Sequence, residues 1–364
     1  MNRILLINTV PTDRNGITNV IFSYFCPIIT EHYVLDYVSI SDIPDYYYKK
    51  VKDGGGECFV LPRRARSLYR YYVTLKRLIA QNNYDAIHIH GNSHTVVIEL
   101  LAAYSAKCKV RIVHAHATSS NFPLIHRILS PFFNSLCNHR LACSEKAGNW
   151  MFGSREFVVI RNGVDTERYA FNEDNRLTVR NKLGWQDKVI LAHIGDFSAN
   201  KNQTFLVDVL NRLRKTNKDI CLLLIGEGEL RQTVSQKVQQ EGLQEFVYFS
   251  GKIPDVEKYL SAIDCILMPS FHEGLPLTLV EQQANGLMCL VSDSVSKEAN
   301  ITGNITYLPL EIDNWEEIIK ALNIESSQIR KQRSETSIRM LKEAGYDVSG
   351  SALSLKQYYS NSIR

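Results

Sequence analysis

Short apolar runs alternate with longer amphipathic stretches along most of the chain. Residues 3–8, 189–195 and 220–225 are rich in apolar residues on both faces, a pattern typical of buried parallel strands, and residues 85–90 predict a further strand. Residues 203–214 place their apolar positions three or four apart, which predicts a helix. The alternation of such strands and helices predicts an α/β fold with parallel sheets.

One strand-loop-helix segment in the second half carries two spaced carboxylates. Gly274 and Pro276 interrupt the loop after the strand, and helical spacing begins at Leu277. Glu273 lies in the loop, whereas Glu281 falls about one turn into the predicted helix. Free N–H groups at a helix start suit a diphosphate, and a carboxylate inside the helix can accept hydrogen bonds from ribose hydroxyls. The segment therefore predicts a site for a molecule that carries both phosphate and sugar.

This segment, Ser-Phe-His-Glu-Gly-Leu-Pro-Leu-Thr-Leu-Val-Glu at residues 270–281, resembles the EX7E motif of retaining glycosyltransferases of family 4. Members of that family have the GT-B fold, in which two Rossmann-like domains face each other across a cleft. The resemblance implies that Glu281 holds the nucleotide ribose and that Glu273 lies against the donor sugar. It also implies that backbone N–H groups from Gly274 to Thr278 contact the sugar and the phosphates.

Composition is consistent with two soluble domains. The chain has 364 residues, and its hydrophobic content of 45% is enough for a substantial core. No apolar run reaches the ~18 residues of a transmembrane helix, and the N-terminus lacks a signal-peptide cleavage pattern. The eight Cys are scattered singly, which favours reduced core thiols over disulfides or zinc. We therefore expect a cytoplasmic protein, with peripheral attachment to the inner face of the membrane left open.

Charge is distributed unevenly along the chain. Residues 1–165 carry 19 Lys and Arg against 12 Asp and Glu, whereas the remainder carries 23 against 26. Residues 61–78 hold six basic residues, three Tyr and no acid. As a helix this stretch is suited to an anionic membrane surface, and a solvated basic helix face is the equal alternative. Nucleic-acid binding is a poorer interpretation because no recognised binding motif accompanies the patch.

Histidines gather at the ends of two predicted strands in the first half. His88 and His90 share one strand face, as do His114 and His116 on the next strand. The carboxyl ends of parallel strands are where open α/β sheets bind ligands. No carboxylate or Cys pattern supports a metal site there. The family resemblance implies instead that His116 contacts the donor sugar, with His114 as the second choice.

Two further segments resemble phosphate-contacting parts of family 4. The loop after the first strand has Asn15-Gly16 where relatives often have Gly-Gly, so Gly16 alone matches. Lys201 matches the position of a cation that binds the diphosphate. Asp196 departs from the family pattern, which often has Arg there, and we assign it no role.

The resemblance implies two sets of site residues. The catalytic residues implied are His116, Glu273 and Lys201. The donor-binding residues implied are Gly16, Asn202, Ile253, Gly274, Leu275, Pro276, Leu277, Thr278 and Glu281.

The turn Asn-Gly-Val-Asp at residues 162–165 resembles the interdomain turn of the family, and the 140–153 segment resembles its capsular and exopolysaccharide members. We expect an acceptor-side domain at 1–165, a nucleotide-sugar domain at 166–345 and a C-terminal tail, 346–364, that packs back on the first domain.

The resulting hypothesis is a retaining glycosyltransferase of the hexosyltransferase type. Its donor would be a nucleotide-diphosphate sugar such as a UDP-sugar, and its acceptor a lipid-linked or polysaccharide glycan. No Asp-x-Asp pair accompanies the site, so we expect no metal and no other cofactor. Two alternatives remain open: a GT-B nucleotide-sugar epimerase, and a non-catalytic protein that binds nucleotide sugars.

Overall fold

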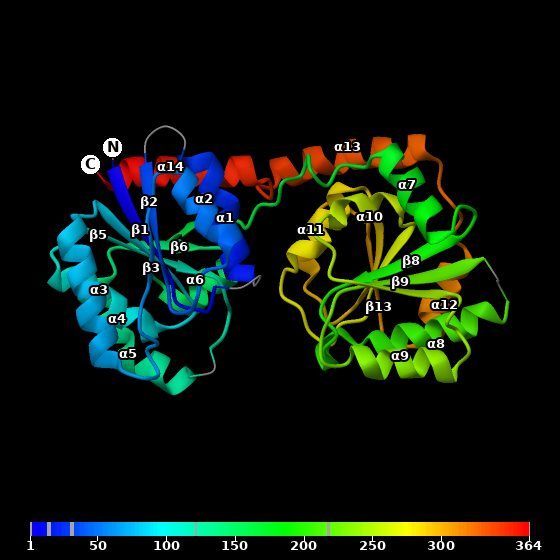
Figure 1. Cartoon of the computed structure of the whole chain (residues 1–364), viewed down its shortest axis with the longest axis horizontal. Coiled ribbons are helices and arrows are strands. Elements are labelled where there is room, and N and C mark those ends of the chain that lie inside the picture. The colour runs from blue at the N-terminus through cyan, green and yellow to red at the C-terminus, as the bar shows by residue number, and fades with distance from the viewer. Residues whose placement is uncertain (1, 13–15, 30–32, 121, 217–218, 364) are drawn as a thin grey trace. The chain divides into compact units, whose positions relative to one another are not determined.

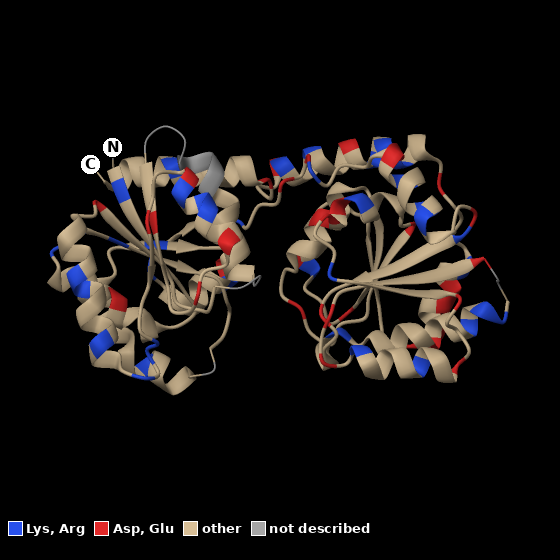
Figure 2. Cartoon of the chain, viewed as in Figure 1, with Lys and Arg blue, Asp and Glu red and all other residues tan. Residues whose placement is uncertain are grey.

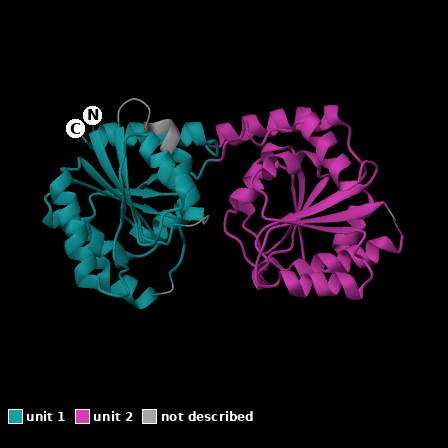
Figure 3. Ribbon diagram, in the orientation of Figure 1, with its two compact units in different colours: residues 1–163, 345–364 teal, residues 164–344 magenta. Residues whose placement is uncertain are grey.

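A computed structural model describes residues 2–12, 16–29, 33–120, 122–216 and 219–363, with the backbone alone for 25–29 (Figure 1). The chain forms two compact units (Figure 3): Met1–Gly163 with Gly345–Arg364 make unit 1, and Val164–Ala344 make unit 2. The unit boundaries at 163 and 345 lie beside the predicted domain bounds of 165 and 346.

Unit 1 is built on a seven-stranded parallel sheet of order β3-β2-β1-β4-β5-β6-β7. Its strands are β1 (Asn2–Asn8), β2 (Tyr33–Ser39), β3 (Cys58–Val60), β4 (Ala86–Gly91), β5 (Val110–Ala115), β6 (His139–Ala142) and β7 (Val158–Val159). The order reverses beside β1 and β4, which makes their carboxyl ends the switch point where such sheets bind ligands.

Helices cover both faces of this sheet (Figure 1). They are α1 (Gly16–Ile29), α2 (Asp45–Asp53), α3 (Leu68–Asn82), α4 (Val97–Ser105) after the short η1 (His94–Val96), α5 (Pro123–Leu136), α6 (Glu145–Phe152) and α14 (Val348–Ser362). Helices α3, α4 and α5 pack side by side against one apolar core, whereas α14 packs on α1. The Ser144 hydroxyl accepts a hydrogen bond from the Ala147 N–H and so caps the start of α6.

The C-terminal tail is part of unit 1. A Cβ atom added to Gly163 would lie 2.6 Å from the backbone of Asp347, so only glycine permits this close approach at the start of α14. The Ser351 hydroxyl donates to the Arg161 carbonyl, and Tyr359 is fully buried beneath the sheet's central strands. These contacts fix α14 against the same face of the sheet that carries His88.

Unit 2 contains a six-stranded parallel sheet of order β10-β9-β8-β11-β12-β13. Its strands are β8 (Val189–Ile194), β9 (Ile220–Ile225), β10 (Val247–Gly251), β11 (Cys265–Met268), β12 (Met288–Ser292) and β13 (Ile305–Leu308). Alternate residues of β8 enter different cores: Val189 and Leu191 face one side, Ile190 and Ala192 the other. This two-sided burial explains the largely apolar sequence of these strands.

The helices of unit 2 supply the two covering layers. They are α7 (Glu173–Leu183), α8 (Gln203–Arg214) after η2 (Ala199–Lys201), α9 (Arg231–Gln240), α10 (Val256–Ala262), α11 (Leu277–Ala284), α12 (Ile312–Lys320) after η3 (Lys297–Ala299), and α13 (Ser327–Glu343). Thus both units are Rossmann-like α/β domains, as predicted.

One predicted element differs from the structure. The basic stretch 61–78 is not one helix, because Ser67 caps α3 through the Arg70 N–H and the preceding basic residues lie before the helix. Helix α1 includes Pro27, which lacks the N–H that would bond the carbonyl one turn back. The charged stretch 315–342 forms two helices, α12 and α13, separated at 321–326.

Candidate active site

An ion pair marks the centre of the site in unit 2. Lys201, at the end of η2, places its Nζ atom 2.6 Å from Oε1 of Glu273, in the loop after β11. Both side chains are largely shielded from solvent, at 15% and 17% exposure. The two predicted catalytic residues of unit 2 therefore meet, although they stand far apart in sequence.

Asn200 holds this loop against η2. Its side-chain amide donates to the His272 carbonyl at 2.9 Å and to Oε1 of Glu273 at 3.3 Å, and it accepts from the His272 N–H at 3.1 Å. On the other side, Glu273 forms a parallel bridge with Val295, and the Ser296 N–H donates to the Glu273 carbonyl. The segment after β12 thus braces the backbone of Glu273.

The start of α11 leaves backbone donors near this ion pair. Pro276 occupies the N-cap position, and no side chain among the described residues caps the helix. Leu277 and Thr278 begin the helix, where N–H groups have no carbonyl partner one turn back. A Cβ atom added to Gly274 would meet no atom within 4 Å, so packing does not require glycine there. Its benefit is an open backbone for a ligand.

Glu281 lies on the fifth position of α11, and burial raises the pKa of its carboxyl to about 7. Tyr169 hydrogen-bonds this carboxyl and acts in the opposite direction, as does the positive charge of Arg168. The pKa of the Tyr169 hydroxyl is raised as well, mainly because Tyr169 is itself buried and secondly because the charge of Glu281 lies close to it. A shielded carboxylate with a single hydroxyl donor retains free lone pairs, which suits a vicinal diol.

The remaining predicted donor residues lie around the same sheet edge. Asn202 precedes α8 in the left-handed conformation, with φ 53°. Ile253 follows β10 and packs on the core beside Leu275. Asp196 is exposed after β8, and its carbonyl accepts from the Gln203 side chain. This contact gives its carboxylate no role in the site.

Gly16 and His116 belong to unit 1. Gly16 opens α1, where an added Cβ atom would meet nothing within 4 Å, and the neighbouring Asn15 lies outside the described residues. His116 directly follows β5, and its Nε2 atom lies 2.8 Å from Nδ1 of His90. The other predicted residues all belong to unit 2.

Four histidine rings form a buried stack above β4 and β5. His90 lies opposite His114 in the strand register, and His88 bonds the Tyr359 hydroxyl through Nδ1 at 2.5 Å. Burial lowers the pKa of His88 and of His116 to about 3, and lowers the pKa values of His90 and His114 well below the ordinary range. The stack is therefore neutral at pH 7.

The ring orientation is a poor match to a metal site. His88, His90 and His114 each bring one ring nitrogen within 4.8 Å of the others. The His88 and His90 rings are stacked, however, with centroids 4.2 Å apart and planes 29° from parallel. Ring-nitrogen lone pairs lie in the ring plane, so stacked rings do not direct them toward one ion.

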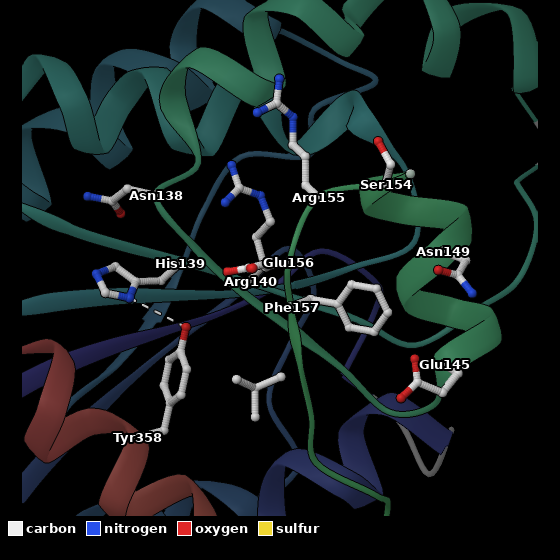
Figure 4. Close-up of a pocket in the computed structure, with 12 residues that line it drawn as sticks. Asn138, His139, Arg140, Glu145, Asn149, Ser154, Arg155, Glu156, Phe157 and Tyr358 are labelled. Carbon is white, nitrogen blue, oxygen red and sulfur yellow. Dashed lines mark hydrogen bonds between the residues drawn. The ribbon is translucent and has the colours of Figure 1, made fainter.

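A separate pocket in unit 1 lies away from these residues (Figure 4). It has a volume of about 630 Å³ and is lined by Arg140, Arg155, Glu156 and Tyr358 among others. Its walls come from the amino ends of β6 and β7, whereas α/β sheets bind ligands at the carboxyl ends. None of the predicted site residues lines it.

The sequence did not reveal three residues that shape the site: Tyr169, Asn200 and His90. Tyr169 lies more than a hundred residues before Glu281, and nothing in the local pattern links the two. Asn200 stands beside Lys201 and His90 was noted within its strand, but their partners follow only from tertiary contacts.

Two Rossmann-like units in one chain are the architecture of the GT-B fold. Residues 31–168 match the family model described as Glycosyltransferase Family 4. Residues 175–336 match the model described as Glycosyl transferases group 1. The chain is a glycosyltransferase with the GT-B fold, similar to family 4.

Individual relatives agree with this class. The chain is 28% identical over 371 residues to a protein of Bacillus subtilis (strain 168) named glycosyltransferase EpsF, covering 96% of this chain and 94% of the relative. It is 27% identical over 285 residues to UDP-Gal:alpha-D-GlcNAc-diphosphoundecaprenol alpha-1,3-galactosyltransferase of Escherichia coli, covering 72% and 71%.

Solved structures share the fold at low sequence identity. Anabaena HepE in complex with UDP superposes with a TM-score of 0.80 at 17% identity, covering 99% of this chain and all of that one. WaaG, a glycosyltransferase involved in lipopolysaccharide biosynthesis, gives 0.70 at 14% identity, covering 98% and 99%. Across the described residues, no helix is both long and apolar enough to span a bilayer.

Proposed function

We propose that this enzyme transfers a hexose from a UDP-sugar to a lipid-linked or polysaccharide acceptor, with retention at the anomeric carbon, in capsule or exopolysaccharide synthesis. The observation that carries the proposal is the grouping of Lys201 and Glu273 at the open start of α11, with the Glu281 carboxyl one turn further on. This grouping offers a cation and N–H donors for a diphosphate and a carboxylate for a ribose.

Each residue has a distinct part in the proposed reaction. The ammonium of Lys201 and the N–H groups at Leu277 and Thr278 stabilise the charge that develops on the diphosphate as the glycosidic bond breaks. Glu273 lies against the donor sugar, and it holds Lys201 in place before the donor binds. These groups provide the charge stabilisation from the protein alone, which is why we propose a metal-independent transfer.

The choice of donor and acceptor is supported by the relatives. HepE has been solved with UDP and with UDP-glucose, and the Escherichia coli relative is named for a UDP-galactose donor and a diphosphoundecaprenol-linked acceptor. A polyprenyl-linked acceptor resides in a membrane, so an enzyme that uses it benefits from a membrane-binding surface. We propose that unit 1 supplies this surface.

The surface combines the exposed apolar face of α5 with the basic residues around α3. On α5, Leu124 is 72% exposed and Ile128 69%, and the helix carries Arg127 but no acidic residue. Figure 2 shows the Lys and Arg of α3, the helix that lies beyond α4 from α5. Apolar side chains flanked by cations suit an anionic bilayer surface.

The basic stretch at residues 61–78 offers fewer cations for binding lipid than its sequence implies. Arg64 is not available to lipid, because it pairs with Glu99 at 3.3 Å and donates to the Thr9 carbonyl. Arg63, Arg66, Arg70, Lys76 and Arg77 remain exposed. We therefore propose that α5 inserts its apolar side chains into the bilayer and that these basic residues attract the anionic lipid headgroups.

The activity can be tested with a panel of nucleotide sugars and a polyprenyl-diphosphate-linked sugar as acceptor. We expect nucleoside diphosphate release that depends on a UDP-sugar and increases with acceptor, and a product whose anomeric coupling in NMR matches that of the donor. An inverted product would contradict the retaining mechanism. Conversion of the donor sugar without diphosphate release would favour the epimerase alternative, and binding without any turnover would favour the non-catalytic one.

A further inference from the structure

Among the residues that the structure describes, His90 is the hydrogen-bond partner of the His116 ring. The Nδ1 atom of His90 lies 2.8 Å from Nε2 of His116, and the two ring planes lie 19° from parallel with centroids 5.1 Å apart. The other ring nitrogen of His116, Nδ1, is buried without a partner among the described residues. The hydrogen bond thus accounts for Nε2 and leaves Nδ1 as the atom that a ligand would satisfy.

His90 is held more firmly than His116. It lies within β4, a strand in the middle of the sheet, whereas His116 follows the end of β5. The His88 ring stacks on the His90 ring, and the Tyr359 hydroxyl of α14 forms a hydrogen bond with His88. A ring at a strand end gains a fixed orientation when its neighbour is anchored in this way.

The hydrogen bond also links the protonation of the two rings. Both are neutral, so one ring must donate its N–H and the other accept. The proton that His90 places or accepts at this contact decides whether Nδ1 of His116 is an N–H donor or a bare acceptor. The orientation and the hydrogen-bonding character of His116 therefore both depend on His90.

We propose that His90 is a positioning residue for His116, fixing the rotamer and the tautomer of that ring through the Nδ1–Nε2 hydrogen bond. The inference rests on the proposed transferase function and on the contact of His116 with the donor sugar that the family resemblance implies. It adds a residue that touches neither the nucleotide nor the sugar, and it explains why a polar imidazole is buried in the centre of this sheet.

The test compares His90→Asn with His90→Leu. The two replacement side chains have nearly the same size and shape, but Asn keeps a hydrogen-bonding atom where Nδ1 lies. Steady-state nucleoside diphosphate release from the UDP-sugar gives kcat and KM for both variants, for His116→Ala and for the wild type. Melting temperatures of the two His90 variants check that both fold.

We expect His90→Leu to lower kcat by about tenfold with KM for the donor unchanged, since one hydrogen bond to a reacting-site group is lost. His90→Asn should stay within about threefold of the wild type. Long-range ¹H–¹⁵N spectra of histidine-labelled protein should show one neutral tautomer of His116 in the wild type and in His90→Asn, and a mixture in His90→Leu.

Equal kcat values for the two His90 variants, or an unchanged His116 tautomer in His90→Leu, would overturn the positioning role while leaving the proposed function intact. If His116→Ala retains wild-type turnover, the proposed roles of both histidines are wrong. The proposed donor site around Glu281 is tested separately, by nucleotide binding. The two failures are therefore distinguishable.

Discussion

At the scale of single residues, the carboxyl of Glu281 is the group whose chemistry depends most on its surroundings. Burial raises its pKa to about 7 from the model-compound value of 4.5, and the Tyr169 hydroxyl counteracts part of that rise. Between pH 4.5 and about pH 7, the folded protein therefore keeps a proton on Glu281 that the unfolded chain has already released. Its contribution to the free energy of unfolding falls as pH rises from about 4.5 to about 7.

The proposed ribose contact has the opposite pH dependence. Ribose hydroxyls donate to the ionised carboxylate, so we expect UDP affinity to rise about tenfold from pH 6 to pH 8, as Glu281 loses its proton. Tyr169→Phe should move the midpoint to higher pH, because the hydroxyl stabilises the ionised form. Calorimetric titrations over this range measure both effects, with Glu281→Gln as the control for the titration of UDP itself. A midpoint unmoved by Tyr169→Phe would contradict this account.

At the scale of elements, unit 2 depends on a buried charge cluster between α7 and the start of β11. Asp264 accepts from Arg176 at 3.0 Å and also pairs with Arg180, and all three side chains are almost fully buried. The Ile190 N–H donates to the same carboxylate, which ties β8 to this cluster. The cluster therefore anchors the amino end of β11, the strand that leads to the loop carrying Glu273.

Asp264→Ala would leave two buried guanidinium groups without a counter-charge. We expect it to lower the free energy of unfolding by about 3–5 kcal/mol, measured by urea denaturation. Asp219→Ala is the matched control, because Asp219 pairs with Lys188 at the exposed surface and should change little. A similar decrease in the free energy of unfolding for the two variants would show that the buried cluster stabilises unit 2 no more than an exposed ion pair does.

Elements with strong local patterns could be predicted from the sequence almost to the residue. The apolar strand at 220–225 and the helix at 203–214 match β9 and α8. The start of α3 was missed because the cap at Ser67 was outweighed by a continuous basic and aromatic pattern. Within the site, Glu273 and Lys201 were found from spacing and resemblance. Tyr169, Asn200 and His90 were not, because their roles arise from contacts between distant segments.

At the scale of the whole molecule, the two units carry different chemical properties. Unit 2 holds the carboxylates and the lysine of the proposed donor site, whereas unit 1 holds the neutral histidine stack and the exposed apolar face of α5. This division is consistent with donor binding in one unit and access to a membrane-bound acceptor in the other.

The surface formed by α5 and the basic residues should bind anionic vesicles, and binding should weaken as salt rises. We expect the double variant Leu124→Ser, Ile128→Ser to lose most sedimentation with such vesicles while keeping its UDP affinity. Leu177→Ser, which removes a leucine of unit 2 that is 56% exposed, serves as the control. Absence of wild-type binding at low salt would refute the membrane surface.

The proposed transfer is independent of a metal ion. If Lys201 and the start of α11 provide the positive charge at the diphosphate, as proposed, turnover should persist after exhaustive treatment with EDTA. The measurement is nucleoside diphosphate release before and after chelation. Loss of turnover that Mn²⁺ or Mg²⁺ restores would show that a metal ion supplies charge assigned here to the protein.

The central claim is that unit 2 binds a nucleotide through Glu281 and uses Lys201 in transfer. Calorimetry with UDP tests it most directly on the wild type, Glu281→Ala, Lys201→Ala and the control Glu335→Ala, an exposed carboxylate on α13. We predict that Glu281→Ala weakens UDP binding by about 1.5–3 kcal/mol through lost ribose hydrogen bonds. Lys201→Ala should chiefly slow transfer, and Glu335→Ala should match the wild type. Unchanged UDP affinity in Glu281→Ala would contradict the assignment of the donor site.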